Sequence, residues 1–249
     1  MAMVSAAVAA SDEGSMRVSM VRSYGNSDSA VERRYGLFMH IAVLMLALMT
    51  IAPPAWAQAT RPIKLVVLGD SLSAGLGLPA QEAFPQKLKK VLQAKGIGVD
   101  MINAGVSGDT SSGGRDRLDW SVPDGTDGVI VELGANDALR GIDPDLTRAA
   151  LTDIVQRLKA RNIAVMLCGM LAPPNYGADY AARFNSIYPD LAKKMNVPFY
   201  PFFLEGVAAD AKLNQADGIH PTAAGIDIVV ANILPTVEAF LGTIAEQQR

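Results

Sequence analysis

The chain of 249 residues has only one cysteine, Cys168. No second thiol is present for a disulfide within the chain, so the fold must rest on its hydrophobic core. Cys168 lies inside the apolar stretch IAVMLCG. A free cysteine in such a stretch is usually a small core residue, so we do not expect a catalytic thiol.

The chain also has few histidines and little net charge. The chain has two histidines, 22 basic and 25 acidic residues, and a formal charge of -3. Without a basic excess, it lacks the electrostatic feature typical of nucleic-acid-binding proteins. Its weak negative charge also argues against a general attraction to anionic lipids. We therefore expect no nucleic acid among its partners.

Only one apolar run near the start is long, LFMHIAVLMLALMTI at 37–51. Arg33 and Arg34 precede it, and APPAWAQA follows with small residues that fit the A-x-A cleavage rule. This pattern indicates an N-terminal extension and signal peptide over 1–57, with the cut possibly after 59. The alternative is an uncleaved anchor, but the run is shorter than the roughly 20 residues that a spanning helix needs. We expect a periplasmic or secreted domain over 58–249, without a stable membrane anchor after cleavage.

Five short apolar runs predict strands at 63–69, 99–105, 128–134, 163–169 and 197–203. Helical patterns cover 81–96, 143–162, 179–196 and 222–241, the last interrupted or bent near Pro235. Strands with little polar alternation are buried on both faces, and strand–helix alternation favours a parallel sheet. The sequence therefore predicts an α/β fold, a flavodoxin-like three-layer α/β/α sandwich with a five-stranded parallel sheet.

Residues that could carry chemistry follow the predicted strands. Ser71 follows the first strand, Gly105 ends the second, and Asn136 follows the third. Asp217 and His220 form DGIHP just before the last helix. Ligands of open α/β sheets bind outside the carboxyl ends of the strands, so we expect these residues to converge at one edge.

His220 is the only histidine after the expected signal peptide, since His40 lies in the apolar run. Asp217 can reach its Nδ1 across one tight turn, which leaves Nε2 to take a proton from Ser71. The alternative is a surface turn with Thr222 as the N-cap of the last helix. A zinc site is a third use of D-x-x-H, but no second histidine or nearby cysteine completes it. We expect no metal.

The segment GDSLSAGLG excludes two familiar loops. It lacks the Lys-Ser/Thr pair of a phosphate-binding loop. It also lacks the second glycine of the G-x-S-x-G nucleophile elbow. If Ser71 is a nucleophile, it belongs to another kind of strand-end turn.

The segments GDS, NAGVSGDTS, GANDALRG and DGIHP resemble the four blocks of the SGNH (GDSL) hydrolase family. Longer stretches, over roughly 64–241, are similar to its bacterial periplasmic multifunctional esterases of thioesterase, lysophospholipase and arylesterase type. The resemblance implies that Ser71 is the nucleophile, His220 the general base and Asp217 its orienting acid. It also implies an oxyanion hole made by the backbone N–H groups of Ser71 and Gly105 and the amide of Asn136.

The function implied is a serine esterase or thioesterase that hydrolyses fatty acyl or aryl esters through an acyl-enzyme, with no cofactor. We expect a monomer that acts on a small molecule. Asp137 and Arg140 are expected to form a structural pair under the Asn136 loop, and 172–177 to border the acyl pocket. Two alternatives stay open: a carbohydrate O-acetyl esterase, and a non-catalytic periplasmic module that binds an anion at helix N-termini.

Overall fold

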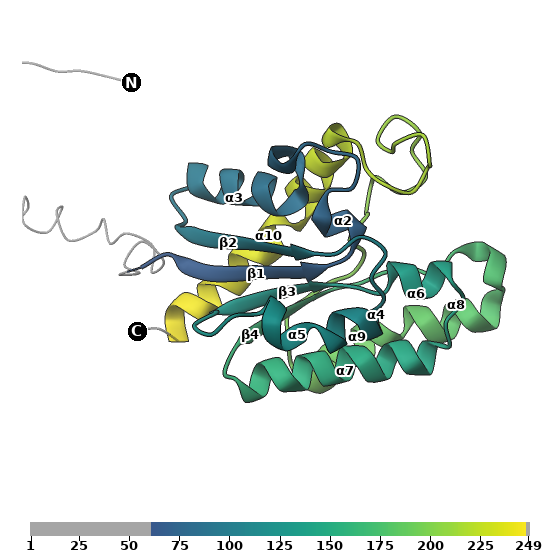
Figure 1. Ribbon diagram of the computed structural model, residues 1–249, viewed down its shortest axis with the longest axis horizontal. Helices are drawn as coiled ribbons and strands as arrows, with labels where there is room; N and C mark the ends of the chain where they lie inside the picture. The colour runs from purple at the N-terminus through teal and green to yellow at the C-terminus, as the bar shows by residue number, and fades with distance from the viewer. Residues whose placement is uncertain (1–60, 248–249) are drawn as a thin grey trace, which may run out of the picture. The chain divides into compact units, whose positions relative to one another are not determined.

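The computed structural model describes residues 61–247 (Figure 1). The expected extension, signal peptide and cleavage site lie outside the described residues. The described part holds one five-stranded sheet in which all neighbouring strands are parallel, in the order β2-β1-β3-β4-β5. The strands are β1 (Ile63–Gly69), β2 (Val99–Gly105), β3 (Gly128–Glu132), β4 (Ala164–Cys168) and β5 (Phe199–Tyr200).

Helices cover both faces of the sheet, so the predicted three-layer α/β/α fold is confirmed (Figure 1). One face carries α3 (Phe84–Ala94) and α10 (Ala223–Gln247), and the other carries α7 (Pro144–Ala160) and α9 (Ile187–Met195). The remaining helices are shorter: α2 (Ser71–Ala74), η2 (Ala80–Glu82), α4 (Ser111–Asp116), α5 (Leu118–Ser121), α6 (Ala135–Leu139), η3 (Pro174–Tyr176) and α8 (Ala178–Asn185).

Two predicted strands differ from the structure. β2 is an edge strand with exposed Asp100 and Asn103, so it is not buried on both faces as β1, β3 and β4 are. β5 has only two residues, because Pro198 and Pro201 flank it and a proline has no N–H for the ladder. Both departures lie at the edges of the sheet, where fewer contacts constrain a strand.

The predicted helix over 179–196 divides at Ser186 into α8 and α9. The last helix, in contrast, is not interrupted and runs through Pro235. Pro235 and Ala231, whose carbonyl loses its bond there, both face solvent, so water can replace that bond. By length and composition alone α10 could cross a membrane, and 44% of its most apolar window is buried against the rest of the domain.

The connections reverse direction at β1, which has β2 on one side and β3 on the other. Such a switch point opens a crevice at the carboxyl ends of the strands. The register sets Gly69 beside both Gly105 and Glu132, so the ends of β1, β2 and β3 lie side by side. The residues expected to carry chemistry follow these ends.

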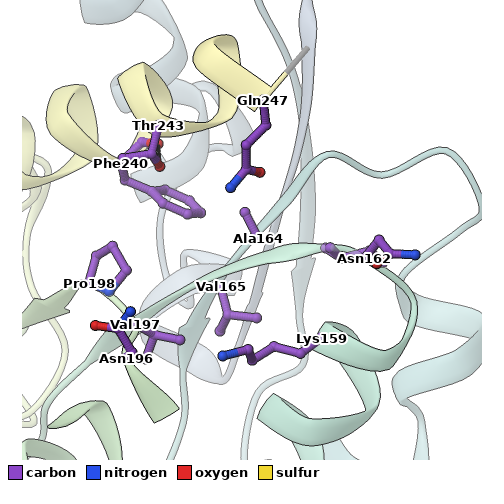
Figure 2. Close-up of a pocket in the computed structure, with 11 residues that line it drawn as sticks. Lys159, Asn162, Ala164, Val165, Asn196, Val197, Pro198, Phe240, Thr243 and Gln247 are labelled. Carbon is purple, nitrogen blue, oxygen red and sulfur yellow. Dashed lines mark hydrogen bonds between the residues drawn. The ribbon is translucent and has the colours of Figure 1, made fainter.

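A wide groove of about 730 Å³ lies at the opposite edge of the sheet (Figure 2). Ala164 at the start of β4, Pro198 before β5 and Phe240 of α10 line it. Lys159, Asn162 and Gln247 at its rim are polar. None of the residues predicted for chemistry lines this groove.

Candidate active site

Ser71 and His220 meet at the carboxyl edge of the sheet, although 149 residues separate them. Ser71 is the first residue of α2 and is 7% exposed. His220 Nε2 lies 2.9 Å from Ser71 Oγ, and His220 Nδ1 lies 2.7 Å from Asp217 Oδ2. The structure thus brings together the three residues that the sequence suggested as nucleophile, base and acid.

Asp217 is held by the turn that it shares with His220. Its Oδ1 accepts the backbone N–H groups of Ile219 at 2.9 Å and His220 at 3.0 Å. These two bonds, that of His220 first, and the contact with the imidazole lower the pKa of Asp217 to about 2. An ionised Asp217 makes Nδ1 the N–H donor, which leaves Nε2 of a neutral His220 to accept the Ser71 proton.

The same turn also caps the last helix, as the alternative reading of DGIHP expected. Thr222 Oγ1 accepts the N–H of Gly225 at 3.2 Å. The His220 carbonyl accepts from Gln215 N–H at 2.7 Å. The capping role and the contact with Ser71 therefore coexist, and the cap gives His220 a fixed place on the scaffold.

The turn between β1 and α2 explains the order Gly-Asp-Ser. Asp70 is the N-cap of α2, and its Oδ1 accepts Leu72 N–H at 2.9 Å. A Cβ on Gly69 would overlap Ser73 Oγ and Glu132 Oε2, so the position has room only for glycine. The cap directs the chain into α2 and places Ser71 at its first residue.

Glu132 is a buried carboxyl group that the sequence reading passed over. It ends β3 and is 0% exposed. Its Oε2 accepts Ser73 Oγ–H at 2.5 Å and Asp70 N–H at 3.3 Å, while Oε1 has no partner within the described part of the chain. Burial, and then the charge of Asp70, raise the pKa of Glu132 well above its usual range. An ionisable residue in an otherwise apolar strand was the available signal.

We expect Glu132→Gln to alter how stability depends on pH. A raised pKa means that the folded chain keeps a proton that the unfolded chain releases above about pH 4.5. Stability then falls with rising pH by up to about 1.4 kcal/mol per unit, until the folded carboxyl ionises. Glutamine cannot ionise, so the variant lacks this loss.

Urea unfolding of both proteins at pH 5.5, 6.5 and 7.5 measures the difference. The free energy of unfolding of Glu132→Gln minus that of the wild type should increase as pH rises. The contribution of Asp217 is present in both proteins and cancels, whereas the charge of Asp70 acts on Glu132, so part of its contribution changes with the substitution. A difference that stays constant across the three pH values would contradict the buried, protonated state of Glu132.

Gly105 does not offer the free donor that the sequence reading assigned to it. Its N–H donates to Asn103 Oδ1 at 2.9 Å. A Cβ at this position would overlap the backbone of Ala74 and the carbonyl of Asp70. Gly105 therefore lets α2 pack closely on the end of β2, which is a structural reason for glycine.

Gly108, three residues further along NAGVSGDTS, has the available donor instead. Its N–H makes no hydrogen bond to any described residue, and its φ of +84° is one that glycine adopts readily. The Gly108 carbonyl accepts from Arg140 Nη2 at 2.8 Å. The next carbonyl, that of Asp109, accepts from Asn136 Nδ2 at 2.9 Å, so Gly108 and Asn136 are neighbours at the site.

Asn136, the second residue of α6, has its amide oriented by two acceptors. Besides the Asp109 carbonyl, its Nδ2 donates to Asp70 Oδ2 at 3.1 Å. Asp137 and Arg140 support this region but do not pair with each other, contrary to expectation. Asp137 accepts from Ser111 and Thr147, whereas Arg140 binds the Gly108 carbonyl.

Arg117 is a second buried ionisable residue that the sequence reading missed. It donates to the carbonyls of Gly69 at 2.9 Å and Ala104 at 2.8 Å, and its Nε contacts Asp109 Oδ2 at 2.5 Å. One guanidinium thus joins the ends of β1 and β2 to the loop that carries Gly108. Its position in the alternating polar pattern of GDTSSGGRDR gave no indication of this burial.

A small apolar cavity of about 170 Å³ opens beside Ser71 and His220. Its walls come from α2 and α6, from the loops after β4 and β5, and from the DGIHP turn. They include Leu72, Ala138, Leu139, Met170, Leu171, Pro173, Phe202, Leu204 and Ile219. Of the segment 172–177, only Pro173 is among them, so this loop borders the cavity at one point. In the described residues, no three His, Cys, Asp or Glu side chains gather in a way that could hold a metal ion.

Comparison with known proteins gives a consistent result. Residues 67–228 match the model of the GDSL-like Lipase/Acylhydrolase family. The chain is 38% identical over 197 residues to Esterase TesA of Pseudomonas aeruginosa, which covers 79% of this chain and 96% of that protein. It is 41% identical over 183 residues to Thioesterase 1/protease 1/lysophospholipase L1 of Escherichia coli K12, covering 73% and 84%.

The crystal structure of AlinE4, an SGNH-hydrolase family esterase, is 43% identical and superposes with a TM-score of 0.62. The match covers 73% of this chain and 98% of AlinE4. Both its fold and its level of identity agree with the family match. With the serine, histidine and aspartate in contact at the edge of the sheet, these matches show that the chain belongs to the GDSL-like lipase/acylhydrolase family, the SGNH hydrolases.

Proposed function

We propose that this protein is a serine hydrolase that cleaves carboxylic esters and thioesters of small molecules through an acyl-enzyme on Ser71. The observation that carries the proposal is the chain of contacts from Asp217 through His220 to Ser71 Oγ, beside an apolar cavity. All three side chains come from one chain, so a monomer suffices for the site.

The reaction follows from these contacts. His220 Nε2 takes the proton of Ser71 Oγ as the oxygen attacks the carbonyl carbon. The same nitrogen then gives the proton to the leaving alcohol, phenol or thiol, and the acyl group stays on Ser71. Water, deprotonated by His220 in turn, releases the acid. Asp217 stays ionised throughout, because its pKa of about 2 lies far below neutral pH.

Charge that develops on the carbonyl oxygen needs fixed donors. We assign this role to the N–H groups of Ser71 and Gly108, with Gly108 in place of Gly105, and to Nδ2 of Asn136. Both hydrogens of that amide are directed to Asp109 and Asp70 in the free protein, so the oxyanion shares one of them when it forms. Neither backbone N–H is bonded to a described residue, which supports their availability. One donor of this kind is worth on the order of 10² to 10³ in rate.

The cavity favours an apolar acyl or aryl group. Its walls carry no charged side chain apart from His220, the base itself, when protonated. This lining favours fatty acyl or aryl esters, and acyl thioesters or lysophospholipids as related substrates, over the carbohydrate O-acetyl esters that are the alternative. The names of the relatives, which include esterase, thioesterase and lysophospholipase, agree with this choice.

A series of p-nitrophenyl esters from acetate to decanoate tests the substrate class, with acetylated xylan as the competing substrate. We expect kcat/KM to rise from acetate to medium-length chains, since each added methylene buries more apolar surface, worth up to about 0.8 kcal/mol. Preference for acetylated xylan would favour the O-acetyl esterase. Inactivity on every ester would favour an anion-binding module.

We also propose that the protein is exported and released by cleavage after residue 57 or 59. The support is the basic, apolar and small-residue order of 33–59. Mass spectrometry of the protein recovered from the periplasm or medium tests this. A mature chain that begins at 58 or 60 is expected, and a full-length chain in the membrane fraction would contradict it.

A further inference from the structure

The carboxyl group of Asp70 has two hydrogen-bond partners among the described residues, and both are donors. Its Oδ1 accepts Leu72 N–H at 2.9 Å and its Oδ2 accepts Asn136 Nδ2 at 3.1 Å. Two acceptor oxygens are a property of a carboxylate, whereas a carboxylic acid or an amide presents one hydrogen-bearing atom that would face a donor. The side chain is 0% exposed, so water cannot relieve such a mismatch.

The surroundings of Asp70 are compatible with an ionised group at neutral pH. The charged and titratable groups around it are Glu132 of β3, Asp109 before α4, His220 of the DGIHP turn and Tyr188 of α9. Burial raises the pKa of Asp70 to about 6, against the two hydrogen bonds, which lower it. Most molecules at pH 7.5 therefore carry the carboxylate.

The bond to Asn136 reaches the reaction centre. A flip of the Asn136 amide by about 180° would exchange the positions of Nδ2 and Oδ1. It would place an acceptor where the oxyanion forms. The Asp109 carbonyl and Asp70 Oδ2 both select the NH₂ orientation. Asp70 is the one of these two acceptors that carries a charge and lies next to the nucleophile in the chain.

We propose that Asp70 is a positioning residue for the oxyanion hole: its carboxylate orients the Asn136 amide while it caps α2 and so places Ser71. The inference rests on the proposed function, since it assigns Asn136 a role in the same reaction. Asp70 touches neither substrate nor leaving group and acts through its neighbours.

Two variants separate the cap from the orientation of Asn136. Asp70→Asn offers one oxygen and one NH₂, so it satisfies only one of the two donors. Asp70→Ser keeps a side-chain oxygen that caps Leu72 N–H but is too short to reach Asn136. Asp100→Asn on the exposed edge of β2 is the matched control.

We expect Asp70→Asn and Asp70→Ser to lower kcat for a p-nitrophenyl ester 10- to 1000-fold, with KM within about threefold of wild type. The loss should not exceed that of Asn136→Ala, because Asp70 acts through Asn136. In an Asn136→Ala background, Asp70→Ser should cost less than threefold more. Asp100→Asn should match the wild type.

The outcomes keep the two claims apart. A wild type without esterase activity would overturn the proposed function itself. An active wild type with an equally active Asp70→Ser would overturn the inference alone. Full additivity of Asp70→Ser and Asn136→Ala would do the same, since it would show that Asp70 does not act through Asn136. If Asp70→Asn fails to fold, Asp70→Ser, which retains the cap, gives the answer.

Discussion

Ser71→Ala should lower kcat/KM for p-nitrophenyl esters by about 10⁴-fold or more while the protein stays folded. The variant lacks the oxygen that attacks the carbonyl, so no acyl-enzyme forms. The loss of a nucleophile removes the function of the base as well, which makes the effect as large as that of deleting the whole triad. Steady-state release of p-nitrophenol measures this loss of kcat/KM.

Ser112→Ala provides the matched control. Ser112 lies in α4 and carries the same side chain, and its hydroxyl makes no hydrogen bond to a described residue. It should retain wild-type activity, and both variants should have thermal midpoints close to that of the wild type. Ser71→Ala with more than a few per cent of wild-type activity would exclude Ser71 as the nucleophile.

His220→Ala is expected to cause a loss of similar size, about 10⁴-fold, for a different reason. The Ser71 hydroxyl stays in place but has no base to take its proton. Within the described residues His220 is the only histidine, so no second imidazole can replace it. Hydrolysis of the same ester measures the loss.

Added imidazole sharpens this test. The deletion leaves space between Asp217 and Ser71, and a small base in that space should restore part of the activity in a concentration-dependent way. The same imidazole should not rescue Ser71→Ala. Activity of His220→Ala near the wild-type level without imidazole would contradict its role as the base.

Much of the fold could be predicted from the chain alone, because β1 and β2 are apolar runs that end at glycines. Their bounds in the structure are those of the runs. The sequence reading extended β5 too far, since it weighed the apolar residues of VPFYPFF above their prolines. It joined α8 and α9 because the apolar spacing continues across Ser186. The break has a local cause that the reading passed over, since Pro189 has no N–H to bond the carbonyl of Asn185, where α8 ends.

Some contacts of the site could likewise be predicted from the sequence, and others could not. Asp217 and His220 are three residues apart, so their contact depends on one local turn and could be foreseen. The contact of His220 with Ser71 follows only if both lie at the carboxyl edge of one parallel sheet. That inference needed the strand–helix alternation and the resemblance to SGNH hydrolases together.

The choice between Gly105 and Gly108 could not be made from the sequence. Which N–H is free depends on the Asn103 side chain, whose oxygen occupies the Gly105 donor. The burial of Arg117 was hidden, because its charge is satisfied by carbonyls of residues distant in sequence. Glu132 gave a signal as an ionisable residue in an apolar strand, but its contacts with Asp70 and Ser73 depend on the fold.

A fluorophosphonate probe tests the central claim most directly, because it forms a covalent bond only with an activated serine. After incubation with the full chain and digestion, mass spectrometry should find one label per molecule on the peptide that contains Ser71. Ser71→Ala should take up no label, and His220→Ala should react far more slowly. Absence of label on the wild type, or label on another serine, would contradict the assignment of Ser71 as the nucleophile.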